Sequence, residues 1–326
     1  SIHLSAGYVI HVRTDAERRR ASAINATIPL ILALFISFVV PLLYIYGERD
    51  SMTLAQSIVV LLLAICVLIL IPSIRESEDL KERFLRGFQN TERDSFFFSM
   101  KSAFKRKNFR STMLVVLLAT LGSTLYYASG IYFMKDILGL PLSYAIYTSL
   151  AGFVALIIFI PFWSNVSRRY GHAKTFKLSL FLITLLYIPF LWVTTIWEAI
   201  IFNFIGGFIV GGYYIALGPV VADVYDECTI STGKHQEAMY AGIQTFFIRI
   251  AIIGQAIIFV IIHILTGYNP NPQAKQTSLA IWGIRLHMAL IPSLCSFVAF
   301  LIILKYYDLI GDKQKTIKRQ LKQMKL

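Results

Sequence analysis

Eight long apolar stretches constrain the fold of this chain more strongly than any other feature of its sequence. A helix needs about 20 predominantly apolar residues to cross the roughly 30 Å hydrocarbon core of a bilayer. Because a helix pairs its backbone N–H and C=O groups internally, it suits a solvent that offers no hydrogen bonds. We therefore predict an all-α membrane protein with eight transmembrane helices, which cover residues 26–46, 54–74, 113–134, 142–163, 176–195, 197–221, 239–265 and 281–304.

Composition agrees with a lipid bilayer as the main partner of the chain. Hydrophobic residues make up 56% of the sequence and charged residues 15%, and the mean hydropathy is +0.65. A soluble domain needs far less apolar sequence to form one core. Strands of a membrane barrel alternate between apolar and polar residues, whereas runs such as SIVVLLLAICVLILI are apolar on every side. This pattern favours helices over a barrel.

The basic residues are distributed unevenly between the two faces of the membrane. The net charge is +13, and 26 of the 31 Lys and Arg residues fall in the N-terminal segment, the C-terminal tail and alternate loops. Loops on the cytoplasmic side carry an excess of Lys and Arg. We therefore place both ends of the chain in the cytoplasm, in a multi-pass protein of the plasma membrane. The positive charge then reflects topology, and we expect no nucleic-acid partner.

The order of the stretches suggests two helical bundles of unequal length. We assign residues 1–74 to the last two helices of an N-terminal six-helix bundle and residues 75–110 to an amphipathic cytoplasmic linker. Residues 111–306 would form a C-terminal six-helix bundle, and residues 307–326 a basic cytoplasmic tail. This division is expected if the chain holds helices 5 to 12 of a twelve-helix protein. A genuine eight-helix protein is the alternative.

The sixth stretch combines small residues with a pair of tyrosines. Gly207 and Gly211 are spaced so that a neighbouring backbone can approach closely. Tyr213 and Tyr214 follow near the middle of the membrane, where an aromatic ring can stack on a sugar and its hydroxyl can bond the edge. Plain packing of the two rings is the alternative to such a contact with a solute.

Three acidic residues lie at the cytoplasmic end of the same stretch, where the helix dipole is already negative. They need cations nearby, so we predict an ion-pair cluster that closes an inner gate. A solvated loop of mixed charge is the alternative. The acids are Asp223, Asp226 and Glu227, and the candidate cations are Lys234, His235, Arg168 and Arg169.

Arg249 stands inside the apolar seventh stretch, where an isolated charge costs at least about 2.5 kcal/mol. It should therefore face a polar cavity, which Gln244 and Thr245 on neighbouring turns would also line. Snorkelling of the guanidinium toward the cytoplasm is the alternative. We expect Arg285 to reach water as an anchor or outer-gate residue, and His263 to form a hydrogen bond between helices.

The sequence carries no motif for catalysis, nucleotide binding or metal binding. A P-loop, HExxH, GxSxG and a dinucleotide fingerprint are all absent, and the three cysteines show no metal-ligand spacing. We therefore predict that the protein is not an enzyme and that it uses no cofactor.

The segment ADVYDECTISTGKHQEAMYAGIQTFFIRIA resembles a motif of the glycoside, pentoside and hexuronide:cation symporters, the melibiose-permease-like branch of the major facilitator superfamily. The segments SMKSAFKRKNFRSTMLV, WSNVSRRYG and WGIRLHMALIPSL support the resemblance, which covers nearly the whole chain. The positions that match the motif are Asp223, Asp226, Gly233, Lys234 or His235, Glu237, Gln244, Thr245 and Arg249.

The resemblance implies a major facilitator fold and alternating access, with uptake of a sugar-like solute driven by Na⁺ or H⁺. It places the cation site on helices that would precede residue 1, and the inner gate at the acidic cluster, its candidate cations and Glu237. Tyr214 corresponds to an aromatic residue that faces the sugar, and Arg249 to a Lys that lines the cavity. We take the substrate-binding residues to be Tyr213, Tyr214, Gln244, Thr245 and Arg249.

One departure from the family pattern widens the choice of solute. Thr27 stands near the position where sugar-transporting relatives carry an Arg. A carrier of lysolipids or other amphiphiles is therefore an alternative, and a membrane sensor that does not transport is another. The solute, the coupling ion, the direction of flux and the oligomeric state stay open at this point.

Overall fold

A computed structural model describes residues 42–45, 48–70, 95–233, 236–271 and 273–323. The chain divides into two compact units, Ser1–Phe98 and Ser99–Leu326, a boundary that falls inside the predicted linker. In the first unit, helix α3 (Arg49–Leu70) covers most of the predicted span 54–74. Residues 26–41 of the first predicted span and 71–74 of the second lie outside the described residues, as do residues 75–94 of the linker.

Six helical segments of the described residues are long and apolar enough to cross a membrane. Each coincides with one of the six stretches predicted between residues 113 and 304, and the described residues contain no β-strand. The prediction of an all-α membrane protein is therefore confirmed. The segments are Lys107–Ile137, Leu142–Tyr170, His172–Leu191, Ile196–Thr232, Ala238–Thr266 and Ser278–Tyr306.

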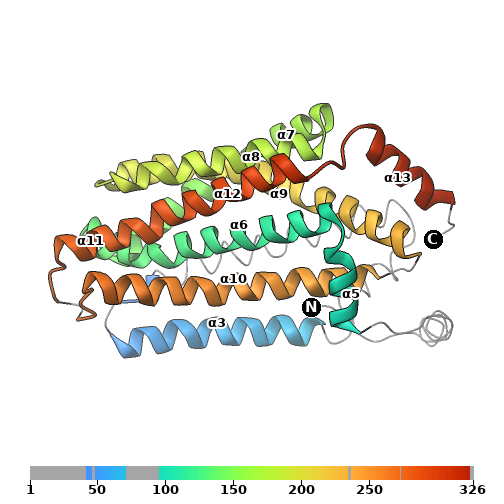
Figure 1. Cartoon of the computed structure of the whole chain (residues 1–326). Coiled ribbons are helices and arrows are strands. Elements are labelled where there is room, and N and C mark those ends of the chain that lie inside the picture. Colours follow the sequence, from blue (N-terminus) through green and yellow to red (C-terminus); the bar gives the residue numbers. More distant parts are fainter. Residues whose placement is uncertain (1–41, 46–47, 71–94, 234–235, 272, 324–326) are drawn as a thin grey trace. The chain divides into compact units, whose positions relative to one another are not determined.

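Single α-helices form most of these spans, and short π-helical or 3₁₀ turns extend several of them (Figure 1). The π-helical turns are η2 and η5, and the 3₁₀ turns are η3 and η4. The second unit contains, in order, α5 (Phe96–Phe104, begun in the first unit), α6 (Lys107–Tyr132), η2 (Phe133–Ile137), η3 (Leu142–Tyr144), α7 (Ala145–Tyr170), α8 (His172–Tyr187), η4 (Ile188–Leu191), α9 (Ile196–Thr232), α10 (Glu237–Thr266), α11 (Ser278–Arg285), η5 (Leu286–Leu290), α12 (Ile291–Tyr306) and α13 (Asp312–Gln323).

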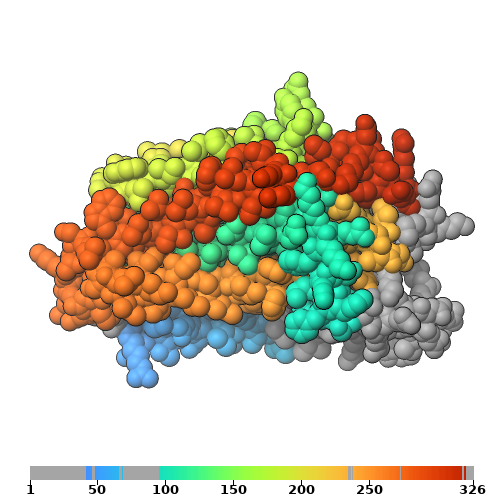
Figure 2. Space-filling model, viewed as in Figure 1, coloured from blue at the N-terminus to red at the C-terminus, as the bar shows by residue number. Residues whose placement is uncertain are grey.

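The helices of the second unit pack in an order that differs from their order in the chain. Helix α9 packs along α7 and also contacts α8, which in turn contacts α12. Helix α6 lies between α12 and α10, and Figure 2 shows its green atoms between the orange α10 and the red α12. The arrangement brings residues from both ends of the unit together.

The ends of α9 show why the helix is longer than the apolar stretch inside it. Thr195 and Glu198 form a capping box, in which the Thr195 hydroxyl accepts from the Glu198 N–H and the Glu198 carboxylate accepts from the Thr195 N–H. The helix continues through the acidic turn and ends at Gly233, whose φ of 66° suits glycine. The three acids therefore lie on a helix.

Helices α7 and α9 approach each other closely through glycine, as the small-residue spacing predicts. A Cβ atom added to Gly207 would lie 1.9 Å from the carbonyl oxygen of Gly152 and 3.0 Å from the Cβ of Ala155. A Cβ added to Gly211 would lie 3.3 Å from the Trp163 ring. The backbone of α7 thus occupies the space of a side chain on α9.

The prediction that Arg285 reaches water at the outer end of the last span is wrong. Its side chain is buried and donates hydrogen bonds to the backbone oxygens of Phe190, at 3.3 Å, and Leu191. These oxygens belong to the end of η4, where carbonyl groups lack helical partners. The guanidinium therefore satisfies a helix end.

We expect Gly207→Ala to lower the thermal unfolding midpoint of the purified protein, because the added methyl group overlaps the Gly152 carbonyl. Overpacking of this kind costs roughly 1–3 kcal/mol. Gly218→Ala is the matched control on the same helix, since no atom lies within 4 Å of its added Cβ. Equal midpoints for the two variants would contradict the close contact between α7 and α9.

Candidate functional site

A group of tyrosines from α6, α8 and α9 forms the aromatic part of the candidate site. Tyr214 on α9 and Tyr127 on α6 are 60% and 69% exposed, and their phenol groups lie close enough for electrostatic interaction. Tyr213 is half-buried and stacks on Phe176 with 5.3 Å between ring centroids. Tyr214 therefore presents its ring at the surface of the unit, while Tyr213 packs inside it.

A second layer of contacts holds the exposed rings. The Tyr126 hydroxyl donates to Oδ1 of Asn203 on α9 at 3.1 Å, and Asn203 donates to the backbone oxygen of Ala199 at 2.8 Å. The Tyr126 ring also contacts Tyr127, at 5.7 Å, and Tyr187 on α8, at 5.3 Å. This layer fixes the position of α6 relative to α8 and α9 beneath the exposed tyrosines.

The predicted cavity residues of α10 have three different environments. Gln244 is half-buried and accepts a hydrogen bond at 2.8 Å from the Tyr225 hydroxyl of α9. Thr245 donates to the backbone oxygen of Ala241, within its own helix. Arg249 is exposed, and among the described residues no hydrogen bond or ion pair holds its guanidinium. Gln244 thus joins two helices, whereas Arg249 is available to a ligand.

Exposed phenol rings and a guanidinium suit a particular kind of ligand. Aromatic faces bind apolar ring surfaces, and phenol hydroxyls bond to polar edges. A guanidinium adds a fork of hydrogen-bond donors. The described residues of the second unit thus present both kinds of group at exposed positions, phenol rings at Tyr127 and Tyr214 and a guanidinium at Arg249.

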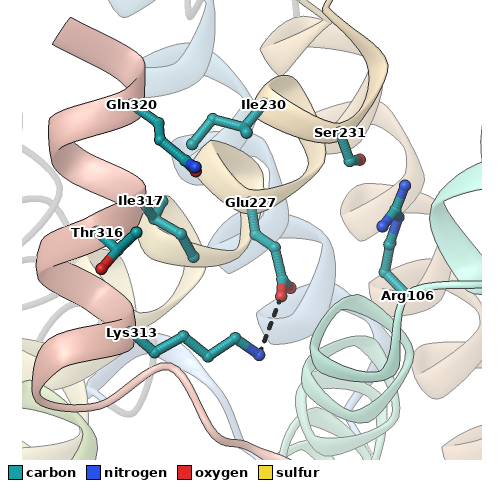
Figure 3. A pocket seen from close by; sticks show the side chains of 8 residues that line it. All are labelled: Arg106, Glu227, Ile230, Ser231, Lys313, Thr316, Ile317 and Gln320. Carbon is teal, nitrogen blue, oxygen red and sulfur yellow. Dashed lines mark ion pairs between the residues drawn. The ribbon is translucent and has the colours of Figure 1, made fainter. Parts of the chain in front are cut away.

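A polar network occupies the opposite, predicted cytoplasmic, end of the unit. The Asn108 side chain, buried at the start of α6, donates to both carboxylate oxygens of Glu227 at 3.0 Å and to Oδ1 of Asp308 at 2.8 Å. Its own oxygen accepts from the Asp308 N–H at 3.0 Å. Nζ of Lys313 lies 2.6 Å from Asp308. The same atom lies 3.5 Å from Glu227 (Figure 3).

A further contact fastens the tail helix α13 to α9. Gln314 Nε2 donates to Oδ2 of Asp223, which is buried. The network therefore joins α6, α9, the segment after α12 and the tail. Two of the three predicted acids, Asp223 and Glu227, take part in it, and Asp226 also has an interaction partner.

The charges of Asp308 and Lys313 support each other. Burial opposes ionisation of Asp308, but bonds from Lys313 and Asn108 hold the pKa of its carboxyl below the ordinary value. Burial likewise opposes the charge of Lys313, but Asp308 and Glu227 raise the pKa of its ammonium group. The stabilisation is therefore complete at neutral pH. It is lost only as the pH falls through the lowered carboxyl pKa or rises through the raised lysine pKa.

A cavity of about 350 Å³ adjoins the network between α9 and α13. Lys313 reaches the Glu227 carboxylate, and Arg106 lies on the opposite side of Glu227 from Lys313 with its guanidinium directed away from that carboxylate (Figure 3). The residues that line the cavity are Arg106, Glu227, Ile230, Ser231, Lys313, Thr316, Ile317 and Gln320.

The structure does not bring the predicted arginines to the acidic cluster. Arg168 donates to the Asn165 side chain, and Arg169 lies 5.5 Å above the ring of Tyr170, so both interact within their own helix. Lys234 and His235 lie outside the described residues, as does the side chain of Glu237. The gating role of these residues stays a prediction.

Sequence reasoning missed several residues that complete the two clusters. The Tyr126–Tyr127 pair repeats the signal of Tyr213–Tyr214 and could have been found in the same way. Asn108, Asp308, Lys313 and Gln314 carry no such signal, because they meet only when the tail folds back on α9. Among the described residues, no group of three or more His, Cys, Asp or Glu is placed to hold a metal ion.

These features define a multi-pass membrane protein that is all-helical over its described residues, with exposed tyrosines, an exposed arginine and a polar network at one end. The chain belongs to the family described as MFS/sugar transport protein, whose sequence model matches residues 3–309. This match confirms the predicted resemblance. A search of curated proteins finds no match. The protein is therefore a transporter of the major facilitator type, which works in a lipid bilayer on a small-molecule solute.

We expect Lys313→Gln to loosen the tail helix, because the variant loses its contacts with both Asp308 and Glu227. Pairs near a surface contribute about 0.5–1 kcal/mol, so hydrogen exchange of the α13 amides should become roughly two- to fivefold faster. Lys315→Gln is the matched control, since Lys315 pairs only with the fully exposed side chain of Asp312, at 3.6 Å. The same exchange rate in both variants would show that Lys313 does not fasten the tail.

Proposed function

We propose that the protein is a secondary active transporter of the plasma membrane that couples the uptake of a sugar or glycoside-like solute to Na⁺ or H⁺ by alternating access. The family match supports the class of transporter. The observation that carries the choice of solute is the exposed Tyr127 and Tyr214 pair on α6 and α9. Both ends of the chain lie in the cytoplasm in this proposal, as the distribution of basic residues predicts.

The surface chemistry favours a sugar for two reasons. A pyranose ring has an apolar face that stacks on phenol rings, and its hydroxyl groups pair with phenol and guanidinium donors. Arg249 has the reach of a long side chain and no partner among the described residues, so it can bind the solute without breaking an existing contact. Gln244 would act mainly as a support, because its side-chain oxygen already accepts from Tyr225.

The inner gate in this proposal includes the docked tail. Glu227 and Asp223 hold α13 against the cytoplasmic end of α9 through Lys313 and Gln314. Release of these contacts would uncover the cavity beside Glu227. Arg168 and Arg169 are candidates for pairing with the acids in another state of the cycle, because their contacts with the described residues lie within α7 in this state.

An amphiphile carrier is the second candidate. It is favoured by the apolar character of the exposed side chains of α10, where Ile253, Ile257 and Val260 are all exposed within four turns of Arg249. A lysolipid would use the same tyrosines beside its headgroup and place its chain along this helix. A competition experiment distinguishes the two candidates: the true type of solute should reduce the uptake of a labelled substrate, and the other type should not.

We expect Tyr214→Ala to weaken solute binding about tenfold, because a lost stacking contact together with its buried area is worth roughly 1.4 kcal/mol. The measurement is uptake of a panel of labelled glycosides into proteoliposomes that hold the full-length protein, under an imposed Na⁺ or pH gradient. Tyr147→Ala is the control. Tyr147 is exposed to a similar degree, 54%, but it lies in the first turn of α7. Uptake of a lysolipid but of no glycoside would replace the sugar assignment by the amphiphile carrier.

Arg249→Ala should reduce uptake and change its dependence on the solute concentration, because a desolvated guanidinium contributes hydrogen bonds worth about 1.5–3 kcal/mol. Arg249→Lys keeps the charge and should restore part of the activity. If the alanine variant transports with unchanged affinity and ion dependence, Arg249 does not line the solute site.

A further inference from the structure

Two histidines meet inside the second unit near its predicted outer end. His263 lies in the last turns of α10 and His287 in the π-helical turn η5. Their Nε2 atoms are 3.2 Å apart, which confirms the predicted hydrogen bond between helices at His263. His287 is fully buried, and His263 is half-buried.

Ser129 on α6 determines which ring nitrogens carry protons. Its oxygen lies 2.5 Å from the backbone oxygen of Leu125 and 2.6 Å from Nδ1 of His287. A hydroxyl has one proton to donate, and the Leu125 oxygen can only accept, so with the proton directed to Leu125 the Ser129 oxygen accepts from Nδ1 of His287. In the neutral pair, Nδ1 of His287 is therefore protonated and its Nε2 is an acceptor. His263 must then donate from Nε2.

Polar and aromatic side chains lie between the histidine pair and the predicted outer end of the unit. The Tyr268 ring stacks on His263 at 4.3 Å, and the Tyr268 hydroxyl donates to Oδ2 of Asp136 at 2.9 Å. Nζ of Lys135 lies 3.5 Å from Asp136. The other aromatic rings in contact with the two histidines are Tyr132 and Phe259. The charged side chain of Arg285 does not join this cluster, because it donates to the backbone at the end of η4.

Both parts of this cluster lie on irregular backbone. Asp136 belongs to the π-helical turn η2, which ends the span Lys107–Ile137, and His287 to the π-helical turn η5, which lies within the span Ser278–Tyr306. A π-turn widens a helix by one residue and is frequent at functional sites. An ionisable residue inside a membrane span is itself a sign of function, because it is costly to bury there.

We propose that His263 and His287 form a proton-binding site that takes up one proton, and only one, from the outer side of the membrane. Water on that side supplies the proton, which forms an N–H bond at Nδ1 of His263. The N–H bond at Nε2 of His263 breaks as Nε2 of His287 gains that proton. A second proton is excluded, because two imidazolium rings whose Nε2 atoms lie 3.2 Å apart would repel each other.

The histidine pair is in contact with the helix that carries the exposed Tyr127. Ser129 accepts from His287 and lies within one turn of Tyr126 and Tyr127 on α6. A charge on the pair would therefore act on the helix that carries one of the exposed tyrosines. A role of this site in ion coupling rests on the proposed transport function, whereas proton binding itself does not.

The test is a pH titration, over about pH 4 to 8, of the full-length protein in lipid nanodiscs without any solute. The sequence has six histidines, so ¹⁵N-histidine labelling gives few signals. We expect the resonances of His263 and His287 to shift together with one midpoint, which corresponds to an uptake of one proton by the pair. In His287→Gln, the joint transition should be lost, and His263 should titrate alone at another midpoint.

His172→Gln is the matched control, because His172 also contacts a serine, Ser167, at 2.7 Å but meets no other histidine in the part of the chain that the structure describes. This variant should keep the joint transition. Titration of His263 alone in the wild-type protein, with His287 neutral throughout, would overturn the proposal, and so would two separate uptakes at the pair. The wild-type titration decides the matter even if His287→Gln does not fold, and failure of the glycoside uptake assay would leave its result unchanged.

Discussion

The need to pair every backbone polar group in a solvent without hydrogen bonds governs this structure. This need makes each span helical, and it also explains why some polar side chains are buried at the ends of helices. The buried Arg285 takes up the carbonyl oxygens of Phe190 and Leu191 where η4 ends. The side chain of Asn108 satisfies two carboxylates and a backbone N–H where α6 begins. Polar side chains thus complete the helix ends that apolar sequence cannot.

The positions of the spans could be predicted from the sequence, because a helix that crosses a bilayer must be apolar along its length and hydropathy measures this directly. Six predicted stretches correspond to helices, but the ends were placed too early where polar residues continue the helix, as in the acidic turn of α9. The prediction for Arg285 was wrong because we took its charge as a sign that the side chain is exposed. A carbonyl end that needs a donor cannot be seen in a sequence without the fold.

The candidate site could be predicted only in part. Tyr214 and Arg249 stand out in an apolar sequence, and both are exposed in the structure. The partners of the acids could not be predicted, since Asn108 and Asp308 are 200 positions apart and meet only through the return of the chain after α12. His287 escaped notice because its importance depends on His263 and Ser129, which reach it from two other helices.

The contact between Gly207 and Gly152 has a mechanical consequence. Two helices whose main chains touch over a side-chain-sized space interlock, so one cannot turn about its axis unless the other follows. Helices α7 and α9 should therefore behave as a stiff pair while the carrier changes shape. Bending should then occur in the other spans, where the π-turns η2 and η5 are positions of the kind at which helices kink.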